Sequence, residues 1–424
     1  MTRPAIGYAG MTHLGLNSAV AAAERGFETI CFDPDAALCA RLTKGELPVI
    51  EPDLAELRAK NAARLTFTAD VQALKSCDVV YVAPDVPTDD EGRSDLSGID
   101  TLLTTVRAGL RPDAVLVVLS QVPPGFTRAR QQPGLILYYQ VETLIFGRAI
   151  ERALHPERYI VGSPTPDQKL PPAFQAYLDA FSCPILVMRY ESAELAKIAI
   201  NCCLVSSVSV ANTLAELCEG IGAAWHEIVP ALKLDKRIGQ YSYLSPGLGI
   251  AGGNLERDLA TVCRIAEAID SDAGVVRSWI ANSQHRRDWA WRTLQRAVLP
   301  QMPNPVIAVL GLAYKENTHS TKNSPSFAFL RHLGAFAVRA YDPVVPVSAA
   351  PHPKAQGADT ALAACAGADV LAVMTPWPEF RALDPAAIAR AMRGRGLLDP
   401  YAVLDADACA KAGLMRYTLG VGRP

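Results

Sequence analysis

The chain has 424 residues, half of them hydrophobic and a fifth charged, a composition typical of a globular protein with two or three domains. Lys and Arg total 41, Asp and Glu total 43, and the formal net charge is −2. Because nucleic-acid-binding proteins usually carry a strong positive charge, we expect no nucleic-acid partner. No run of eighteen apolar residues occurs, so we expect no membrane span.

A strand-like segment lies at residues 4–9, so we expect no signal peptide. The ten cysteines form no CxxC pairs, and several, such as Cys31, Cys77 and Cys218, lie in apolar segments. We therefore expect reduced, buried cysteines in a cytoplasmic protein, with no disulfides and no metal site.

The first 185 residues or so alternate strand-like runs with helical stretches. Residues 16–25 have the periodicity of a helix, which we expect to end at Gly26. Strand-like runs follow at 28–32, 79–83, 114–119 and 135–139. Strands separated by helices predict an α/β fold with a parallel, doubly wound sheet.

The pattern changes near residue 191. One long amphipathic helix is predicted over 191–223 and another over 255–269, with a glycine-rich loop at 235–254 that we expect to be functional. After the proline-marked segment 300–305, strand-like runs return at 306–310, 336–341 and 370–374. We predict two Rossmann-like domains, residues 1–188 and 301–424, joined by a helical connector, residues 189–300. The connector is a natural place for the contact between the two chains of a homodimer.

The first predicted strand leads into a dinucleotide-binding motif of the GxGxxG type, here Gly10-Met11-Thr12-His13-Leu14-Gly15. The first glycine makes the tight turn and the third lets helix and strand pack closely, whereas Thr12 replaces the glycine that approaches the pyrophosphate. Asp33 ends the second strand, where a carboxylate accepts hydrogen bonds from the adenosine ribose and repels a 2′-phosphate, so NAD is favoured over NADP. By itself, the motif is also compatible with an ordinary turn followed by a surface Asp.

Further fragments follow in a fixed order: GELPVIEPDL at 45–54, GRSDL at 92–96, SQVPPG at 120–125, HPERYIVG at 155–162, ELAKIAIN at 194–201, GLAYK at 311–315 and TPWPEF at 375–380. Together they give the chain a resemblance to the UDP-glucose/GDP-mannose dehydrogenase family over nearly its whole length. That family oxidises a sugar C6 alcohol twice with two NAD molecules. The intermediate aldehyde is captured by a cysteine thiolate, and water then hydrolyses the thioester.

The resemblance implies roles for four residues at the reacting carbon. Lys197 and Asn201, four residues apart on one helix, polarise the reacting oxygen. Asp258 orients the lysine or a water, and Glu142 belongs to the acid–base apparatus. Spacing alone would favour a solvated lysine and a polar helix residue, and it is the resemblance that favours the functional interpretation.

The family's nucleophilic cysteine corresponds to Asn254 in this sequence. An amide cannot form a thioester, and we expect Asn254 to cap the following helix instead. Cys202 and Cys203 are not expected to substitute, because they point away from the Lys197 and Asn201 face. The family's water-handling Thr and second Glu are likewise replaced, by Gln121 and Phe146.

The resemblance also implies the binding residues. Those assigned to the cofactor NAD are Gly10, Thr12, His13, Leu14, Gly15, Asp33, Val86, Ser120, Gln121 and Lys322. Those assigned to the nucleotide sugar are Leu144, Arg237, Tyr241, Tyr243, Gly249 and Lys315. The alternatives are surface cations for Arg237 and Lys315, and core packing for the two tyrosines.

The sequence therefore predicts an NAD-dependent oxidoreductase acting on a nucleotide sugar, limited to one two-electron oxidation or to a transient one. A redox-neutral epimerase with bound NAD is one alternative. A non-catalytic binding protein is another, motivated by Thr12, Val86 and Asn254. A four-electron dehydrogenase with an unrecognised nucleophile is the third.

Overall fold

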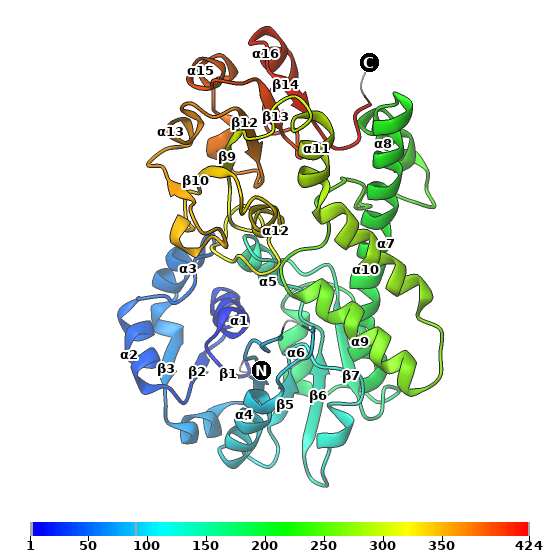
Figure 1. Cartoon of the computed structure of the whole chain (residues 1–424). Coiled ribbons are helices and arrows are strands. Elements are labelled where there is room, and N and C mark those ends of the chain that lie inside the picture. Colours follow the sequence, from blue (N-terminus) through cyan, green and yellow to red (C-terminus); the bar gives the residue numbers. More distant parts are fainter. Residues whose placement is uncertain (1–2, 90, 423–424) are drawn as a thin grey trace. The chain divides into compact units, whose positions relative to one another are not determined.

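The computed structural model describes residues 3–89 and 91–422 and forms two compact units, residues 1–200 and 201–424, each built around one sheet (Figure 1). The division falls inside the long helix α7 (Tyr190–Ile221). The three domain boundaries expected from the sequence stay a prediction.

The first unit contains an eight-stranded sheet of order β3-β2-β1-β4-β5-β6-β7-β8. Its strands are β1 (Ile6–Ala9), β2 (Thr29–Phe32), β3 (Leu65–Thr68), β4 (Val79–Val82), β5 (Val115–Val118), β6 (Ile136–Gln140), β7 (Tyr159–Ser163) and β8 (Ile185–Arg189). The strand order reverses between β1 and β4, and in open α/β sheets ligands bind outside the carboxyl ends of the strands at such a point.

Neighbouring strands of this sheet are parallel, with one exception. β6 and β7 pair antiparallel, with Tyr139 opposite Gly162, whereas the other neighbours pair parallel, as the α/β pattern predicts. The connection between them carries only the six-residue helix α5 (Ala149–Leu154), which packs against α1 (His13–Glu24). β7 therefore begins at the edge of the sheet where β6 ends, and it runs in the opposite direction.

Local signals place the helices of the first unit. Nearly all of α1 is buried, which explains its run of alanines, and Gly26 ends it with a φ of +87°. The Asp35 side chain caps α2 (Ala36–Lys44), and Gly45 ends that helix in the left-handed conformation. The other helices are α3 (Leu54–Lys60), α4 (Ser97–Ala108) and α6 (Pro172–Asp179).

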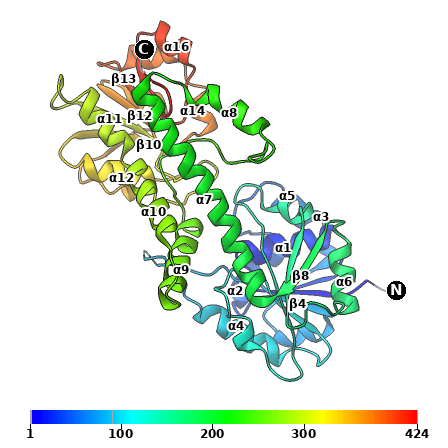
Figure 2. The same cartoon turned by 90° about the vertical axis from the view of Figure 1, so that its right-hand side faces the viewer.

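Helix α7 has 32 residues, and by length and composition alone it is apolar enough to cross a membrane (Figure 2). Its most apolar 18-residue window is 39% buried. One such helix is weak evidence, because the core helix of a soluble protein passes the same test. Small polar residues such as Ser206 and Ser207 interrupt its apolar run, and the expectation of no membrane span stays a prediction.

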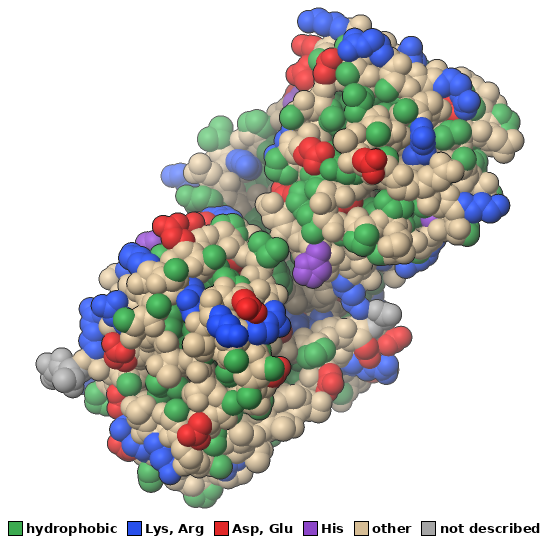
Figure 3. Space-filling model, turned by 90° about the vertical axis from the view of Figure 1, so that its left-hand side faces the viewer, with side chains coloured by type: hydrophobic (Ala, Val, Ile, Leu, Met, Phe, Trp, Pro, Cys, Tyr) green, Lys and Arg blue, Asp and Glu red, His purple; other side chains and the backbone are tan. Residues whose placement is uncertain are grey.

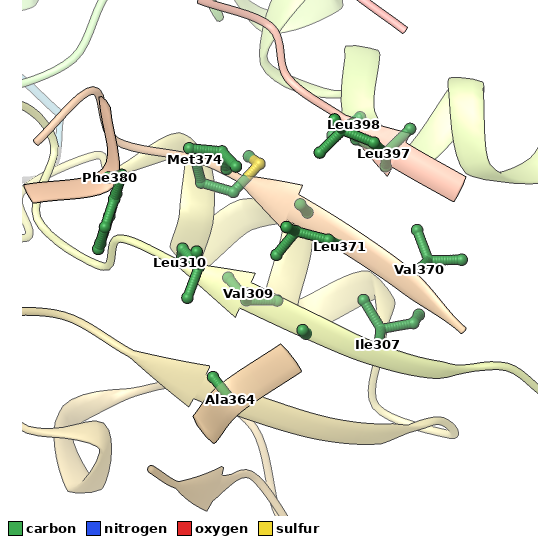
Figure 4. Packing of buried hydrophobic residues seen from close by; sticks show 14 of the residues in the cluster. Ile307, Val309, Leu310, Ala364, Val370, Leu371, Met374, Phe380, Leu397 and Leu398 are labelled. Carbon is green, nitrogen blue, oxygen red and sulfur yellow. The ribbon is translucent and has the colours of Figure 1, made fainter. Parts of the chain in front are cut away.

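The second unit contains a six-stranded parallel sheet of order β11-β10-β9-β12-β13-β14. Its strands are β9 (Val306–Leu310), β10 (Ala337–Tyr341), β11 (Gln356–Gly357), β12 (Val370–Val373), β13 (Gly396–Leu398) and β14 (Met415–Tyr417). Its core is aliphatic, and Val309 on β9 and Leu371 on β12 belong to it (Figure 4). Both sheets agree with the predicted Rossmann-like architecture.

The helices of the second unit are α8 (Trp225–Leu234), α9 (Asn254–Ala268), α10 (Gly274–Arg287), α11 (Trp289–Ala297), α12 (Pro325–His332), α13 (Ala361–Cys365), α14 (Pro378–Arg381), α15 (Pro385–Ala391) and α16 (Ala406–Lys411). On the face drawn in Figure 3, positive and negative side chains are interspersed, in keeping with the small net charge.

Candidate functional site

The dinucleotide-binding motif forms the turn between β1 and α1. Gly10 has a φ of +94°, and a Cβ there would lie 2.9 Å from the backbone nitrogen of Pro84. A Cβ on Gly15 would lie 1.9 Å from the carbonyl oxygen of Gly10. The tight turn and the close helix–strand packing therefore require both glycines, as the motif predicts.

Asp33 lies directly after β2 and is only 9% exposed. Its Oδ2 accepts a hydrogen bond from Met11 N at 2.7 Å, and its Oδ1 accepts one from Asp35 N at 3.0 Å. Each carboxylate oxygen has a second lone pair, so Asp33 fixes the turn and is still able to accept from a ribose hydroxyl.

His13, the first residue of α1, lies among groups that were not predicted from the sequence. Its Nε2 is 2.8 Å from Glu51 Oε1, and its ring stacks on Phe146 with centroids 4.0 Å apart. Its backbone nitrogen donates to Asp85 Oδ2 at 3.0 Å. One signal was present in the sequence: Asp85 follows β4 closely, at the carboxyl edge where ligands bind.

Four more residues predicted to bind the cofactor lie near this turn. Leu14 is buried in α1, and Ser120 and Gln121 are buried just after β5. The Ser120 hydroxyl donates to the carbonyl of Pro84, and Val86 is half-buried after β4. Lys322, the remaining predicted cofactor residue, belongs to the second unit.

Lys197 and Glu142 form an ion pair in the first unit. Lys197 Nζ is 2.7 Å from Glu142 Oε1, with side chains 13% and 14% exposed, and it also donates to the Glu142 carbonyl at 3.2 Å. Glu142 Oε2 accepts from Leu144 N at 2.9 Å. This low exposure strengthens a charge-assisted bond and fixes the position of the ammonium group.

Asn201 and Asp258 form a buried pair in the second unit, 8% and 2% exposed. Asn201 Nδ2 donates to Asp258 Oδ2, and Arg257 Nε lies 3.4 Å from Asp258 Oδ1. Arg257, which was not predicted, supplies a countercharge for a carboxylate that is costly to bury alone. Asn201 lies four residues after Lys197 on the continuous helix α7.

Asn254 does not cap α9, contrary to the expectation. The N-cap residue is Gly253, without a side-chain cap, and Asn254 is the first helical residue and exposed. The Gly253 carbonyl already accepts from Arg257 N at 3.1 Å, so the helix begins one residue earlier than predicted.

All ten cysteines are free thiols, and Cys31, Cys77 and Cys218 are buried as expected. Cys202 is half-buried beside Asn201. Burial, and to a lesser degree Asp258, raises the pKa of its thiol to about 11. Cys202 is therefore a neutral thiol near neutral pH and a weak nucleophile.

The residues predicted for the substrate in the 235–254 loop are largely exposed. Arg237 is 89% exposed and pairs with Asp235 at 2.6 Å, rather than with Asn201 or Asp258. Tyr241 and Tyr243 are 91% and 50% exposed, so the alternative of core packing is wrong for both.

The remaining predicted residues of the second unit have structural contacts. Gly249 has a φ of +79°, and a Cβ there would lie 2.3 Å from Ser283 O. Lys315 Nζ lies 5.7 Å from the ring centroid of Tyr314, and the Lys322 carbonyl accepts from Gly252 N at 3.0 Å. Within residues 3–89 and 91–422, no group of three or more His, Cys, Asp or Glu side chains is suited to hold a metal ion.

Three consecutive family models match the chain. They describe the NAD binding domain, the central domain and the UDP binding domain of the UDP-glucose/GDP-mannose dehydrogenase family, at residues 5–176, 191–284 and 308–406. A UDP-glucose 6-dehydrogenase of Rhizobium meliloti (strain 1021) is 30% identical over 435 residues, which cover 98% of each chain. The chain belongs to the UDP-glucose/GDP-mannose dehydrogenase family.

Other relatives agree. A UDP-glucose 6-dehydrogenase of Pseudomonas aeruginosa is 30% identical over 98% of this chain and 96% of its own. A UDP-glucose dehydrogenase structure from Pyrobaculum islandicum has a TM-score of 0.82 and 25% identity over 94% of each chain. A UDP-D-ManNAc dehydrogenase structure from Pyrococcus horikoshii has a TM-score of 0.82 over 98% of this chain and 99% of its own, at 24% identity. The last two confirm the fold.

Family membership makes this chain an NAD-dependent oxidoreductase of the nucleotide-sugar dehydrogenase type. When bound, NAD accepts the hydride. The turn at Gly10 and Gly15 and the carboxylate of Asp33 fit NAD. One group does not: the carboxylate of Asp85 at the N-terminus of α1.

Proposed function

We propose that this enzyme performs a single two-electron oxidation of a hydroxyl group on a nucleotide-linked sugar and forms no thioester. The alcohol carbon gives its hydride to NAD, the hydroxyl loses its proton, and a carbonyl group results. The observation that carries this proposal is Asn254, the residue that corresponds to the family's cysteine and an exposed first residue of α9.

The proposed roles follow from the two buried pairs. Lys197 donates a hydrogen bond to the reacting oxygen, stabilises its negative charge and is positioned by Glu142. One N–H of the Asn201 amide donates to Asp258, and the second is able to donate to the reacting oxygen of the sugar. Asp258, as a carboxylate, receives the proton directly or through a water.

No replacement nucleophile is supported beside these residues. Cys202 is the cysteine whose thiol Asp258 influences, and its pKa of about 11 makes it a poor thiolate source. Return of the hydride to the opposite face of the carbonyl would make the net reaction an epimerisation. The replacement of the family's cysteine by Asn254 supports this second candidate function as much as the first, because neither reaction needs a thiolate.

The test is the stoichiometry of NADH and product. Purified enzyme is incubated with NAD and UDP-glucose, then with a panel of other nucleotide sugars, and each product is weighed by mass spectrometry. One NADH per sugar and a loss of two mass units support the proposal. No net NADH with an isomerised sugar supports the epimerase. Two NADH and an acid, or no reaction with any nucleotide sugar, would contradict both.

Two variants sharpen this test. Asn254→Ala and Cys202→Ser should each retain turnover within a few-fold, because neither residue forms a covalent bond. Lys197→Ala should lower turnover by about a hundredfold or more, as expected when one oxyanion stabiliser is lost. A large loss in Cys202→Ser would instead identify a relocated nucleophile.

We further propose a cytoplasmic homodimer that packs through α7. Val210, Leu214, Leu217 and Ile221 are 39–76% exposed and spaced by four, three and four residues, so they form one apolar stripe. The wild type should be dimeric in light scattering and remain in the supernatant without detergent. The double variant Leu214→Glu, Leu217→Glu should be monomeric, whereas the control Ile50→Glu, at a 95% exposed position, should stay dimeric. A monomeric or membrane-pelleted wild type would rule out this assembly.

A further inference from the structure

The N-terminus of α1 already holds a negatively charged group. Asp85 Oδ2 accepts a hydrogen bond from His13 N at 3.0 Å, within the first turn of the helix. The backbone N–H groups of this turn and the helix dipole attract anions. In a Rossmann fold the same turn receives the pyrophosphate of the dinucleotide. The carboxylate therefore occupies an anion position that the cofactor also needs.

A second bond ties Asp85 to the motif. Asp85 N donates to Thr12 Oγ1 at 2.8 Å. Thr12 stands where the GxGxxG motif has its second glycine, so the hydroxyl introduced at this position holds the backbone of Asp85. Although the Asp85 residue as a whole is exposed, burial of its carboxyl group raises its pKa, so a side chain that turns into water regains hydration.

The surroundings add negative charge. Asp33 Oδ2 accepts from Met11 N, and Glu51 Oε1 lies 2.8 Å from His13 Nε2. Among the described residues, no lysine or arginine pairs with Asp85, Asp33 or Glu51, and His13 is the one titratable partner that faces Asp85 and Glu51. A pyrophosphate that approaches this turn therefore meets the Asp85 carboxylate, which no described lysine or arginine neutralises.

We propose that Asp85 determines the affinity for the cofactor: its carboxylate binds the α1 N-terminus in the free enzyme, and the pyrophosphate must displace it. Displacement requires the Asp85 side chain to turn away from His13 N, whereas the bond from the Asp85 backbone to the Thr12 hydroxyl is able to stay in place. The effect depends on the diphosphate alone, because adenosine does not reach the N-terminus of α1. This inference rests on the NAD site of the family and not on the proposed single oxidation.

The test measures equilibrium binding of NAD, ADP-ribose and adenosine by titration calorimetry. Asp85→Asn keeps a hydrogen-bond acceptor and removes the charge, and Asp85→Ala removes both. In both variants we expect NAD and ADP-ribose to bind about tenfold more tightly, which corresponds to about 1.4 kcal/mol. Adenosine should bind as it does to the wild type, within twofold.

Two controls isolate the mechanism. Glu91→Gln removes a charge from the same loop, where Glu91 pairs with Arg93 at 3.1 Å, and should leave all three affinities unchanged. Thr12→Gly should increase the affinity for NAD in the wild-type background but add little to Asp85→Asn, because Thr12 acts by positioning the Asp85 carboxylate.

Unchanged or weaker NAD binding in both Asp85 variants, or an equal change for adenosine, would overturn the inference. Melting temperatures show whether a variant has lost its fold. The readout needs no turnover, so its failure is distinct from failure of the stoichiometry test.

Discussion

The two sheets share one local arrangement of a glycine and an aspartate, but the aspartate serves a different purpose in each. In the first unit β1 is followed by Gly10 and β2 by Asp33, and in the second unit β9 is followed by Gly311 and β10 by Asp342. Both glycines have a φ of +94°. Asp33 accepts a hydrogen bond from Met11 N, and Asp342 accepts one from Leu312 N at 2.6 Å. Each donor is the residue directly after the glycine.

The difference lies in how fully each carboxylate is engaged. Asp33 accepts backbone hydrogen bonds from two residues, Met11 and Asp35. Asp342 accepts five from described residues, namely from Leu312 N, Ala313 N, Val344 N, Val345 N and the indole of Trp377. Asp33 keeps capacity for a ligand, whereas Asp342 is fully used by the fold. An Asp directly after a strand therefore indicates a ligand site only where the surrounding loops leave its carboxylate oxygens able to accept further hydrogen bonds.

The largest effect should come from removing the more heavily engaged carboxylate. Asp342→Ala leaves several buried donors unsatisfied and should destabilise the second unit by about 3–5 kcal/mol. Asp33→Ala should lower stability by about 1–2 kcal/mol, since it removes fewer bonds. Urea unfolding of both variants measures the difference. Equal losses would show that the two aspartates play the same structural part.

Much of this arrangement was predictable from the sequence, because it is local. The β1 turn, Asp33 and the restart of the α/β pattern after residue 305 follow from residues close together in the chain. Asp85 and the contacts of His13 with Glu51 and Phe146 were not predicted, since they depend on which loops meet at the carboxyl edge. The first helical turn of α9 was also misassigned, because an Asn next to a glycine is compatible with either cap position.

The glycines provide the second comparison. Gly10→Ala and Gly311→Ala each place a Cβ at a positive φ, within 2.9 Å of Pro84 N or 2.4 Å of the Thr375 side chain. Both should destabilise their units by about 1–3 kcal/mol. Only Gly10→Ala should also abolish NAD binding, measured by calorimetry at a temperature where the variant stays folded. NAD loss in Gly311→Ala would contradict the division of roles.

Cofactor choice gives a smaller effect. Asp33→Asn removes the charge that repels a 2′-phosphate, so the preference for NAD over NADP should fall by about tenfold, or about 1.4 kcal/mol. Relative affinities for the two cofactors measure it. Asp342→Asn, if it folds, is the matched control and should leave the preference unchanged. An unaltered preference in Asp33→Asn would mean that Asp33 does not face the ribose.

The smallest effect concerns a second shared feature, an Asp that holds the start of the first strand. Asp78 accepts from Ala5 N and pairs with Arg111, and Asp369 accepts from Val306 N and pairs with Arg393. Arg393 holds the pKa of the Asp369 carboxyl below its usual range. A lowered folded pKa contributes stability that is present above the unfolded pKa, near 4, and is lost as the pH falls through the folded pKa.

Asp369→Asn should therefore lower the stability of the second unit by about 1 kcal/mol at pH 7, and the difference from wild type should shrink below about pH 4. Urea midpoints measured from pH 3 to pH 7 test this, with Asp384→Asn, an exposed helix cap, as a control for loss of one acidic side chain. A difference that stays constant with pH would mean that the bond to Val306 N, which an amide oxygen is able to keep in part, matters more than the charge pair with Arg393. The start of the second sheet would then be held by backbone capping rather than by electrostatics.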